Sequence, residues 1–452
     1  MADARSLLHR RKVLMTTLVI VFSCAWAWSA TFTVTTTADD GAGSLRQAIT
    51  DANNTAGPDT IDFNIPEGQC QVSGVCAITL VTSLPNVTEG VILDGTTQPR
   101  YGSAPANVCA TAASPSYLRI QLATSDDYIL NIETSSLVET FMVRGLAFVD
   151  QTKNAHGIRY HTYSQGHVQC NHFGIDGTGT LALNLGSGMC VGCLGGGGGN
   201  LIIGTDGDGV NDVGERNVFG AGYDGIFVNL GSSSYPNWIA GNYFGVSADG
   251  VTEMDLTTGI YMRQSVAQTV IGSNGDGTSD GLERNVFAYC YKGVSLDTRV
   301  GIGHQNFVVG NWIGRDARGG LAGNYYGIFV SGDSTDQKIS RNQIMGNEIG
   351  INVSSDATLS DSSGANCIVG NSSGLLHTGT AVNLFAEDNY WGAADGPSGV
   401  GSGGGDTVNV TGSGSVDFDP WLTSPHDVCI FVFVNGFESG NLGDWSSSTG
   451  GP

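Results

Sequence analysis

Residues 203–219, IGTDGDGVNDVGERNVF, return 68 residues later as IGSNGDGTSDGLERNVF at 271–287, with eleven of the seventeen positions identical. A second marker runs alongside as CNHFGIDGTG, GNYFGVSADG and GNWIGRDARG, whose asparagines Asn171, Asn242 and Asn311 are 71 and 69 residues apart. Short apolar bursts between Gly, Asp and Asn turns at so long a period are typical of a repeat architecture. They predict a solenoid, with about three coils in each repeat of roughly 70 residues.

The composition fits an array of packed strands. A chain of 452 residues can fold as one unit when it is built of repeats. It holds 68 glycines but 11 prolines, and 40% of its residues are hydrophobic, so the glycines indicate turns and not disorder. The formal charge of −23, with 19 Lys and Arg, argues against nucleic acid or an anionic membrane as partner.

The first 29 residues have the pattern of a signal peptide. Four basic residues within the first twelve precede an apolar run at 13–28, which is too short and one-sided for a membrane span. Cleavage would follow Ala27 or Ser29, and a loose lipoprotein-like box at Cys24 leaves lipidation open. We expect an exported protein, secreted or at the cell surface, with outer-membrane association open and no membrane span in the mature chain.

The segment after the signal peptide predicts strand, helix and strand. Residues 31–37 alternate in β-branched residues, 44–54 place Leu45, Ala48, Ile49 and Ala52 on one helical face, and 60–63 form a second strand. A short amphipathic helix here would cover the open apolar end of the first coil. Beyond it, short strands recur with little helix potential, for example at 128–132, 157–160, 225–229, 259–262, 327–330 and 350–353.

Asparagines mark the coils. Gaps between Asn-led bursts are 25 (Asn217 to Asn242), 26 (Asn285 to Asn311) and then 24 and 23 residues (Asn342, Asn366, Asn389), and a unit of this size holds one coil of a parallel β-helix. Asparagines at the same turn of successive coils can hydrogen-bond in a ladder. Asn also tolerates the left-handed backbone that a tight corner demands.

These markers, the DGTTQP loop at 94–99 and the start GAGSLRQAITDAN at 41–53 resemble a group of secreted bacterial right-handed parallel β-helix proteins with a pectate-lyase-like shape. NYWGAADGPSG at 389–399 and VDFDPWL at 416–422 resemble the usual end of such a helix. The resemblance covers about residues 31–425 and implies the fold far more firmly than an activity. The expected fold class is all-β, a single-stranded right-handed parallel β-helix with an N-terminal capping helix.

We divide the chain into a signal peptide (1–29), an N-terminal cap with the first strands (30–85), a right-handed parallel β-helix (86–425) and a C-terminal appendage (426–452). VNGFESGNLGDW within the appendage resembles a short terminal element of exported proteobacterial proteins. It is either a sorting or anchoring tag or a last hairpin on the helix end.

Two groups of side chains suggest metals. The Gly-rich loops carry oxygen side chains that could bind calcium, namely Asp206, Asp208 and Asp212, then Asn274, Asp276 and Asp280. Their spacing does not match the EF-hand pattern. Asx turns explain Asp and Gly in such loops without a metal. His167 and Cys170 lie 23 residues before Cys190 and Cys193, with His172 nearby, so zinc, a disulfide from Cys170 to the next coil, or unpaired stacked thiols remain open. Nine cysteines remain after cleavage, which leaves at least one thiol, and most are expected to be small buried hydrophobes.

Carbohydrate chemistry remains the alternative to simple binding. Pectate-lyase-like helices often host lyases or glycosidases, which need paired carboxylates or a metal-assisted base with a basic residue. Asp126–Asp127 is an isolated pair of neighbouring carboxylates, and Gly303–His304 resembles a polygalacturonase element only faintly. The arginines are scattered and expected to be solvated, namely Arg263, Arg299, Arg315 and Arg318. We assign no catalytic, cofactor-binding or metal-binding residues.

Aromatic residues favour binding. They could present a stacking strip for sugar rings on one long face, although many, like Phe227 and Phe329, would equally stack in or on the helix; they are Tyr223, Tyr235, Trp238, Tyr243, Tyr261, Tyr289, Tyr291, Trp312, Tyr325 and Tyr326. The sequence therefore favours a non-catalytic, monomeric extracellular protein that binds polysaccharide, with a polysaccharide lyase or glycoside hydrolase as the alternative. No cofactor is expected, apart from the calcium left open above.

Overall fold

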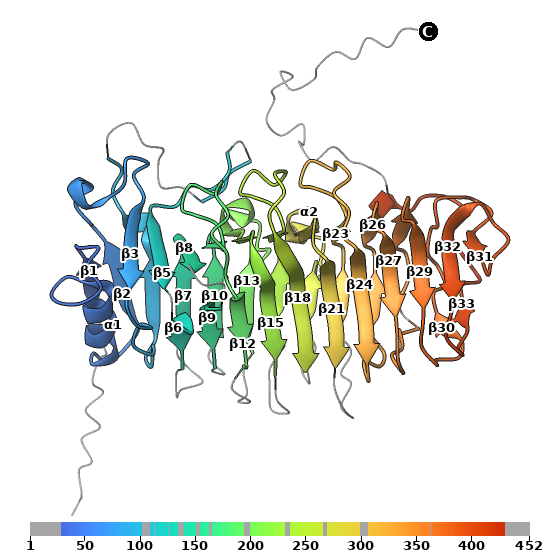
Figure 1. Cartoon of the computed structure of the whole chain (residues 1–452), viewed down its shortest axis with the longest axis horizontal. Coiled ribbons are helices and arrows are strands. Elements are labelled where there is room, and N and C mark those ends of the chain that lie inside the picture. Colours follow the sequence, from blue (N-terminus) through green and yellow to red (C-terminus); the bar gives the residue numbers. More distant parts are fainter. Residues whose placement is uncertain are drawn as a thin grey trace, which may run out of the picture.

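The computed structural model describes residues 29–101, 109–112, 114–124, 126–133, 140–150, 154–161, 165–193, 199–230, 236–264, 269–298, 306–361 and 363–429. Within these ranges the chain winds into a solenoid of three long parallel sheets, A, B and C, and successive coils add one strand to each sheet (Figure 1). Successive parallel crossovers of this kind are expected to be right-handed. The predicted parallel β-helix is confirmed.

Sheet A holds β1 (Thr31–Val34), β2 (Asp59–Phe63), β4 (Val91–Asp94), β7 (Thr140–Arg144), β10 (Gln165–Gln169), β13 (Leu201–Gly204), β16 (Trp238–Ala240), β19 (Val270–Gly272), β22 (Phe307–Val309) and β25 (Lys338–Ser340). Sheet B holds β3 (Cys76–Leu80), β5 (Ile120–Thr124), β8 (Leu146–Asp150), β11 (His172–Phe173), β14 (Val218–Phe219), β17 (Tyr243–Phe244), β20 (Val286–Phe287), β23 (Trp312–Ile313), β26 (Gln343–Met345) and β28 (Cys367–Val369).

Sheet C holds β6 (Tyr128–Ile132), β9 (His156–Tyr160), β12 (Ser187–Val191), β15 (Gly222–Asn229), β18 (Leu256–Gln264), β21 (Lys292–Thr298), β24 (Tyr326–Gly332), β27 (Ile349–Val353), β29 (Ser373–His377), β32 (Gly405–Val410) and β31 (Pro397–Gly399). A small parallel pair, β30 (Leu384–Phe385) and β33 (Val416–Asp417), lies near the C-terminal end. The helical pieces are α1 (Leu45–Asn53), α2 (Asp280–Glu283), η1 (Glu67–Gln69), η2 (Gly95–Thr97), η3 (Asp212–Glu215) and η4 (Asp427–Cys429).

The core is stacked coil upon coil. On sheet B, Phe148, Phe173, Phe219, Phe244 and Phe287 form a column of near-parallel rings with centroids 4.6–5.0 Å apart. All five are at most 1% exposed. Because identical apolar residues recur at the coil spacing, each ring fills the space above the one before it, and the sequence repeat becomes a continuous core.

Asparagines line the corner between sheets A and B. In seven consecutive steps the Nδ2 of one asparagine donates to the Oδ1 of the next at 2.8–3.1 Å, through Asn171, Asn217, Asn242, Asn285, Asn311, Asn342, Asn366 and Asn389. The predicted ladder is confirmed. The ladder asparagines were expected to adopt the left-handed backbone at this corner, and that expectation was wrong. The left-handed residue is usually the one before the asparagine, such as Cys170, Gly241 or Arg341.

The 68-residue repeat spans two coils and not three. The ladder passes from Asn217 through Asn242 to Asn285, with steps of 25 and 43 residues, so one intermediate coil separates the two copies of the opening motif. Long loops alternate between the A–B corner (205–217, 273–285) and the B–C corner (174–186, 245–255, 314–325). A coil with a long loop therefore contains far more residues than the 23–26 that the shortest gaps suggested.

Helix α1 covers the N-terminal end of the core, as predicted. Ser44 caps it by accepting a hydrogen bond from the Gln47 N–H, and Asn54 ends it. The buried face is Leu45, Ala48, Ile49 and Ala52, and it joins the same apolar cluster as the strands. The helix thus shields the first coil from water.

Four disulfides tie the described chain: Cys70–Cys76, Cys109–Cys170, Cys190–Cys193 and Cys367–Cys429. Cys290 is the one free and buried thiol among the described cysteines. The expected leftover thiol is thus found, but the expectation that most cysteines are unpaired was wrong. The bond to Cys429 fastens the beginning of the C-terminal appendage to β28. The appendage motif and the signal peptide lie outside the described residues.

Candidate functional site

The outer face of sheet C carries a strip of aromatic side chains. The backbone register aligns Phe227 with Tyr261, and Ser295 on the next strand with Phe329. The Phe227 and Tyr261 rings are 5.3 Å apart, and Phe227, Tyr261 and Phe329 are half-buried. Their neighbours Ile226, Ile260 and Ile328 are buried in the core, because successive strand residues point to opposite faces.

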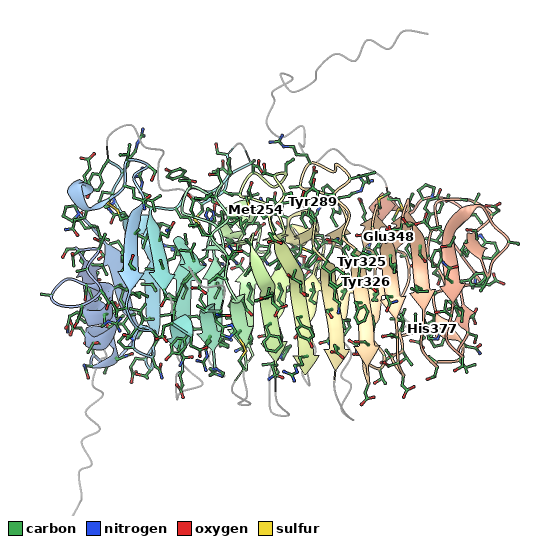
Figure 2. All side chains as sticks on the ribbon, in the orientation of Figure 1. Met254, Tyr289, Tyr325, Tyr326, Glu348 and His377 are labelled. Carbon is green, nitrogen blue, oxygen red and sulfur yellow. A yellow bond between two sulfur atoms is a disulfide. The ribbon has the colours of Figure 1, made fainter. Side chains whose placement is uncertain are left out.

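A second aromatic group lies at the beginning of the same strands. Tyr291 and Tyr325 stack at 5.2 Å, and Tyr326 meets both edge-on at 5.6 and 4.7 Å. Tyr291 and Tyr325 are 51% and 46% exposed, so about half of each side chain is open to solvent. Figure 2 shows Tyr325 and Tyr326 together at the start of β24, with Glu348 next to them before β27. We call Phe227, Tyr261, Tyr291, Tyr325, Tyr326 and Phe329 the sheet C aromatic strip.

Charged groups are embedded in this strip. The Nζ of Lys292 lies 3.8 Å from the centroid of the Phe329 ring, a cation–π contact. Burial lowers the pKa of Lys292, while Asp297 and Asp224 act in the opposite direction. Burial also raises the pKa of Asp224 to about 6, partly offset by the Thr258 hydroxyl and by Lys292. The Tyr261 hydroxyl donates to Asp297 Oδ2 at 3.2 Å.

Asp224 and Asp297 are too far apart to act as a glycosidase pair. Asp224 is in register with Thr258 and then with Lys292, so two strand spacings separate it from the strand of Asp297. Asp297 lies five residues beyond Lys292, which puts the two Cα atoms roughly 19 Å apart. Paired glycosidase carboxylates are about 5–10 Å apart.

Tyr223 lies on β15 of sheet C and is 59% exposed, but the other remaining predicted aromatics that the structure describes do not join this face. Tyr243 and Trp312 lie on sheet B, where Arg216 and Arg284 stack on them with the guanidinium carbon 4.0 and 4.5 Å from the ring centroids. Trp238 lies on sheet A and donates to the Gly272 carbonyl. Tyr235 lies outside the described residues. The expected single long face is thus divided among three sheets, and the open part is the sheet C aromatic strip.

The repeated Glu-Arg-Asn-Val-Phe motif is structural, and each side chain has a separate partner. In the second copy, Glu283 accepts from the Asn274 N–H, Arg284 covers Trp312, and Asn285 belongs to the ladder. Phe287 stacks in the core. The first copy repeats these contacts, beginning with Glu215 and the Asp206 N–H.

The Asp-Gly half of each motif forms a loop, which we call the first acidic loop (205–215) and the second acidic loop (273–283). One carboxylate oxygen from each of Asp206, Asp208 and Asp212 lies within 4.8 Å of the others, and Asp276, Asp280 and Glu283 form a second such group. Within the loops, Asx-type bonds recur, for example from the Thr278 N–H to Asp276. These bonds account for the recurrence of Asp and Gly in the two loops.

The cysteine and histidine group is not a thiolate zinc site. Cys170 is bonded to Cys109 and Cys190 to Cys193, so neither pair of sulfurs is free to bind a metal as thiolate. The Cys170 disulfide therefore runs to an earlier segment and not to the next coil. His172 is fully buried; its Nε2 lies 2.7 Å from Ser116 Oγ and its Nδ1 3.0 Å from the Asp176 carbonyl.

Among the described residues, the candidate catalytic side chains do not converge. Asp126 accepts from the Ser83 N–H and hydroxyl, whereas Asp127 forms a salt bridge with Arg159 at 3.2 Å. Arg315 is 8% exposed, contrary to the solvated position expected for it, and its Nε lies 3.0 Å from the Met345 sulfur. His304 and Arg299 lie outside the described residues.

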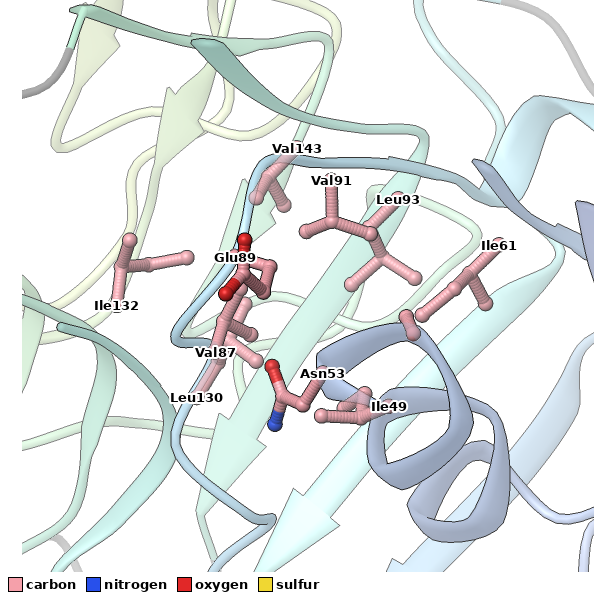
Figure 3. A pocket seen from close by; sticks show the side chains of 11 residues that line it. Ile49, Asn53, Ile61, Val87, Glu89, Val91, Leu93, Leu130, Ile132 and Val143 are labelled. Carbon is pink, nitrogen blue, oxygen red and sulfur yellow. The ribbon is translucent and has the colours of Figure 1, made fainter. Parts of the chain in front are cut away.

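Within the described part of the chain, the interior at the N-terminal end offers no room for a ligand. Figure 3 shows the gap between α1 and the first coils, lined by Ile49, Val87, Leu93 and other apolar side chains. Its volume is about 10 Å³, which is about the space of one water molecule. No helix among the described residues has the length and apolar character needed to cross a membrane.

The chain matches no protein-family model and no curated protein among those compared with it. Function is therefore inferred from the site itself, and above all from the sheet C aromatic strip.

Proposed function

We propose that this is an exported, non-catalytic β-helix protein of pectate-lyase-like type that binds polysaccharide along sheet C. The observation that carries the proposal is the sheet C aromatic strip, whose open tyrosine rings are spaced along successive coils. Sugar rings have apolar faces that stack on aromatic side chains, and a row of such platforms suits an extended chain. The four disulfides and the N-terminal targeting pattern support export, because disulfides persist in oxidising compartments.

The ligand that fits best is a neutral glycan. Asp224, Asp297 and Glu348 lie among the rings of the strip with Lys292, and the whole chain has a formal charge of −23. A polyanion would be repelled by this field before it reached the rings. Carboxylates and tyrosine hydroxyls can instead accept and donate hydrogen bonds to sugar hydroxyls.

A glycan array with the purified mature protein tests the proposal, followed by calorimetry on the best ligand. We expect neutral polysaccharides to bind and the double variant Y291A/Y325A to bind at least tenfold more weakly, because two exposed platforms are removed. The matched control is Y291F/Y325F, which keeps both rings and should retain binding within about threefold, since hydroxyl loss costs little at an exposed site. Equal affinity of the alanine variant and the wild type would refute the assignment of the site.

A lyase or hydrolase is the competing function, and one feature favours it. The pKa of about 6 makes Asp224 a carboxyl group that can be protonated near neutral pH, as a general acid must be. Its separation from Asp297 argues against a paired mechanism. Assays for reducing ends and for unsaturated products decide between the two functions. Turnover by the wild type that is abolished in D224N would show that the protein is an enzyme and would refute the non-catalytic binding function.

A further inference from the structure

The second acidic loop gathers three carboxylates on one side of the A–B corner. One oxygen from each of Asp276, Asp280 and Glu283 lies within 4.8 Å of the others. Their burial increases inward, from exposed Asp276 through half-buried Asp280 to fully buried Glu283. The loop folds back over the preceding coil, where the Glu283 carbonyl accepts a hydrogen bond from the Gly241 N–H. The group is thus open at one end and closed by the solenoid at the other.

Glu283 supplies an observation independent of this clustering. Its side chain is 0% exposed; Oε2 accepts from the Asn274 N–H at 3.0 Å, but Oε1 has no hydrogen-bond partner. Oε1 lies against the main chain of the first acidic loop, because a Cβ added at Gly207 would lie 2.2 Å from it. A buried carboxylate oxygen without a donor or a cation is costly, so this atom calls for a hydrogen-bond donor or a cation.

We propose that the second acidic loop binds one calcium ion through Asp276, Asp280 and Glu283. The donor set is oxygen only, which a hard cation prefers over the nitrogen and sulfur ligands of zinc or copper. Calcium binds oxygens at about 2.3–2.6 Å, so ligands on opposite sides of one ion are about 4.6–5.2 Å apart. A separation of no more than 4.8 Å allows all three oxygens to reach one ion of this size.

The electrostatics of the loop agree with a bound cation. Burial raises the pKa of Glu283, and Asp280 and Asp276 raise it further, against the opposing effects of the Ser273 hydroxyl and the Asn274 N–H. None of the salt bridges among the described residues involves these three carboxylates. The adjacent Arg284 is held over the Trp312 ring instead. A divalent ion would supply the missing positive charge.

The first acidic loop offers a matched comparison. It has the same fold and its own group of three carboxylates, Asp206, Asp208 and Asp212. Its glutamate differs, because Glu215 is half-buried and is not among the groups with an unpartnered buried oxygen. The proposed ion is therefore assigned to the second loop, and the first loop serves as the control.

Titration calorimetry of the mature chain, stripped with chelator and titrated with calcium chloride, tests the proposal. We expect one saturable site, and a melting temperature that rises with calcium because the ion binds the folded state. E283Q and D276N should each weaken binding at least tenfold, whereas D208N in the first loop should bind as the wild type does. D276N alters an exposed residue and keeps the fold, so a loss in this variant cannot be attributed to misfolding.

Three results would overturn the assignment: no heat and no thermal shift in the wild type, unchanged affinity in both E283Q and D276N, or a loss that D208N shares. The glycan-binding variant Y291A/Y325A should bind calcium normally. Failure of one proposal therefore leaves the other standing.

Discussion

His172 is a fully buried histidine that the fold holds neutral. Burial lowers its pKa from the ordinary 6.5 to about 4. Because the unfolded chain takes up a proton below pH 6.5 and the folded chain does not, this residue contributes stability above that pH and loses it as the pH falls toward 4. The contribution lost between about pH 7 and 4.5 is about 2 kcal/mol.

Urea denaturation of wild type and H172Q at both pH values measures this effect. The wild type should lose about 2 kcal/mol more free energy of unfolding than the variant on acidification. Asp224 acts in the opposite direction, because its raised pKa favours the folded state at low pH, but it is common to both proteins and cancels. Identical pH dependence of the two proteins would show that His172 is not the titrating group.

The residues of the candidate site were only partly accessible from the sequence. The tyrosines could be named, but the sheet to which each belongs follows from strand register, which depends on loop lengths that vary from coil to coil. The partner of His172, Ser116, is 56 residues away and marked by no motif. Likewise Cys109 and Cys170 are 61 residues apart, and nothing in their spacing indicates a bond.

At the scale of the element, the asparagine ladder was predictable because it repeats at the coil length. Each member uses its whole amide: Asn285 Nδ2 donates to the Ile239 carbonyl and to Asn311, and its Oδ1 accepts from the Asn242 N–H and Nδ2. The number of coils per repeat was mispredicted. The long loops alternate between two corners, so the same loop sequence returns only at every second coil, and the length of each coil cannot be read from the shortest gaps between asparagines.

Replacing Asn285 by alanine should therefore remove the ladder hydrogen bonds to both neighbouring coils, at Asn242 and at Asn311. Several buried polar groups would lose their partners, and each costs about 1–3 kcal/mol, so we expect a loss of about 3 kcal/mol or more. Asn54 is the control, because its exposed amide bonds only to the Thr50 carbonyl, and N54A should cost less than about 1 kcal/mol. Chemical denaturation measures both, and equal costs would contradict a stabilising ladder.

At the scale of the whole molecule, the solenoid must close its ends. Each coil buries its apolar face only against the next coil, so the first coil depends on α1. Ile49 is 1% exposed and belongs to the same cluster as the strand residues. An uncovered end would present apolar surface and main-chain groups to a second molecule, which would pair with it.

I49D should convert the monomer expected from the sequence into self-associating species. A buried unpaired carboxylate is incompatible with the apolar contact, and we expect α1 to detach, with about 4 kcal/mol of stability lost. T50D is the matched control, because Thr50 lies on the exposed side of the same helix. Light scattering coupled to size exclusion should show association for I49D and a single unchanged species for T50D. An I49D protein that stays monodisperse and melts at the wild-type temperature would show that the solenoid end does not need its cap.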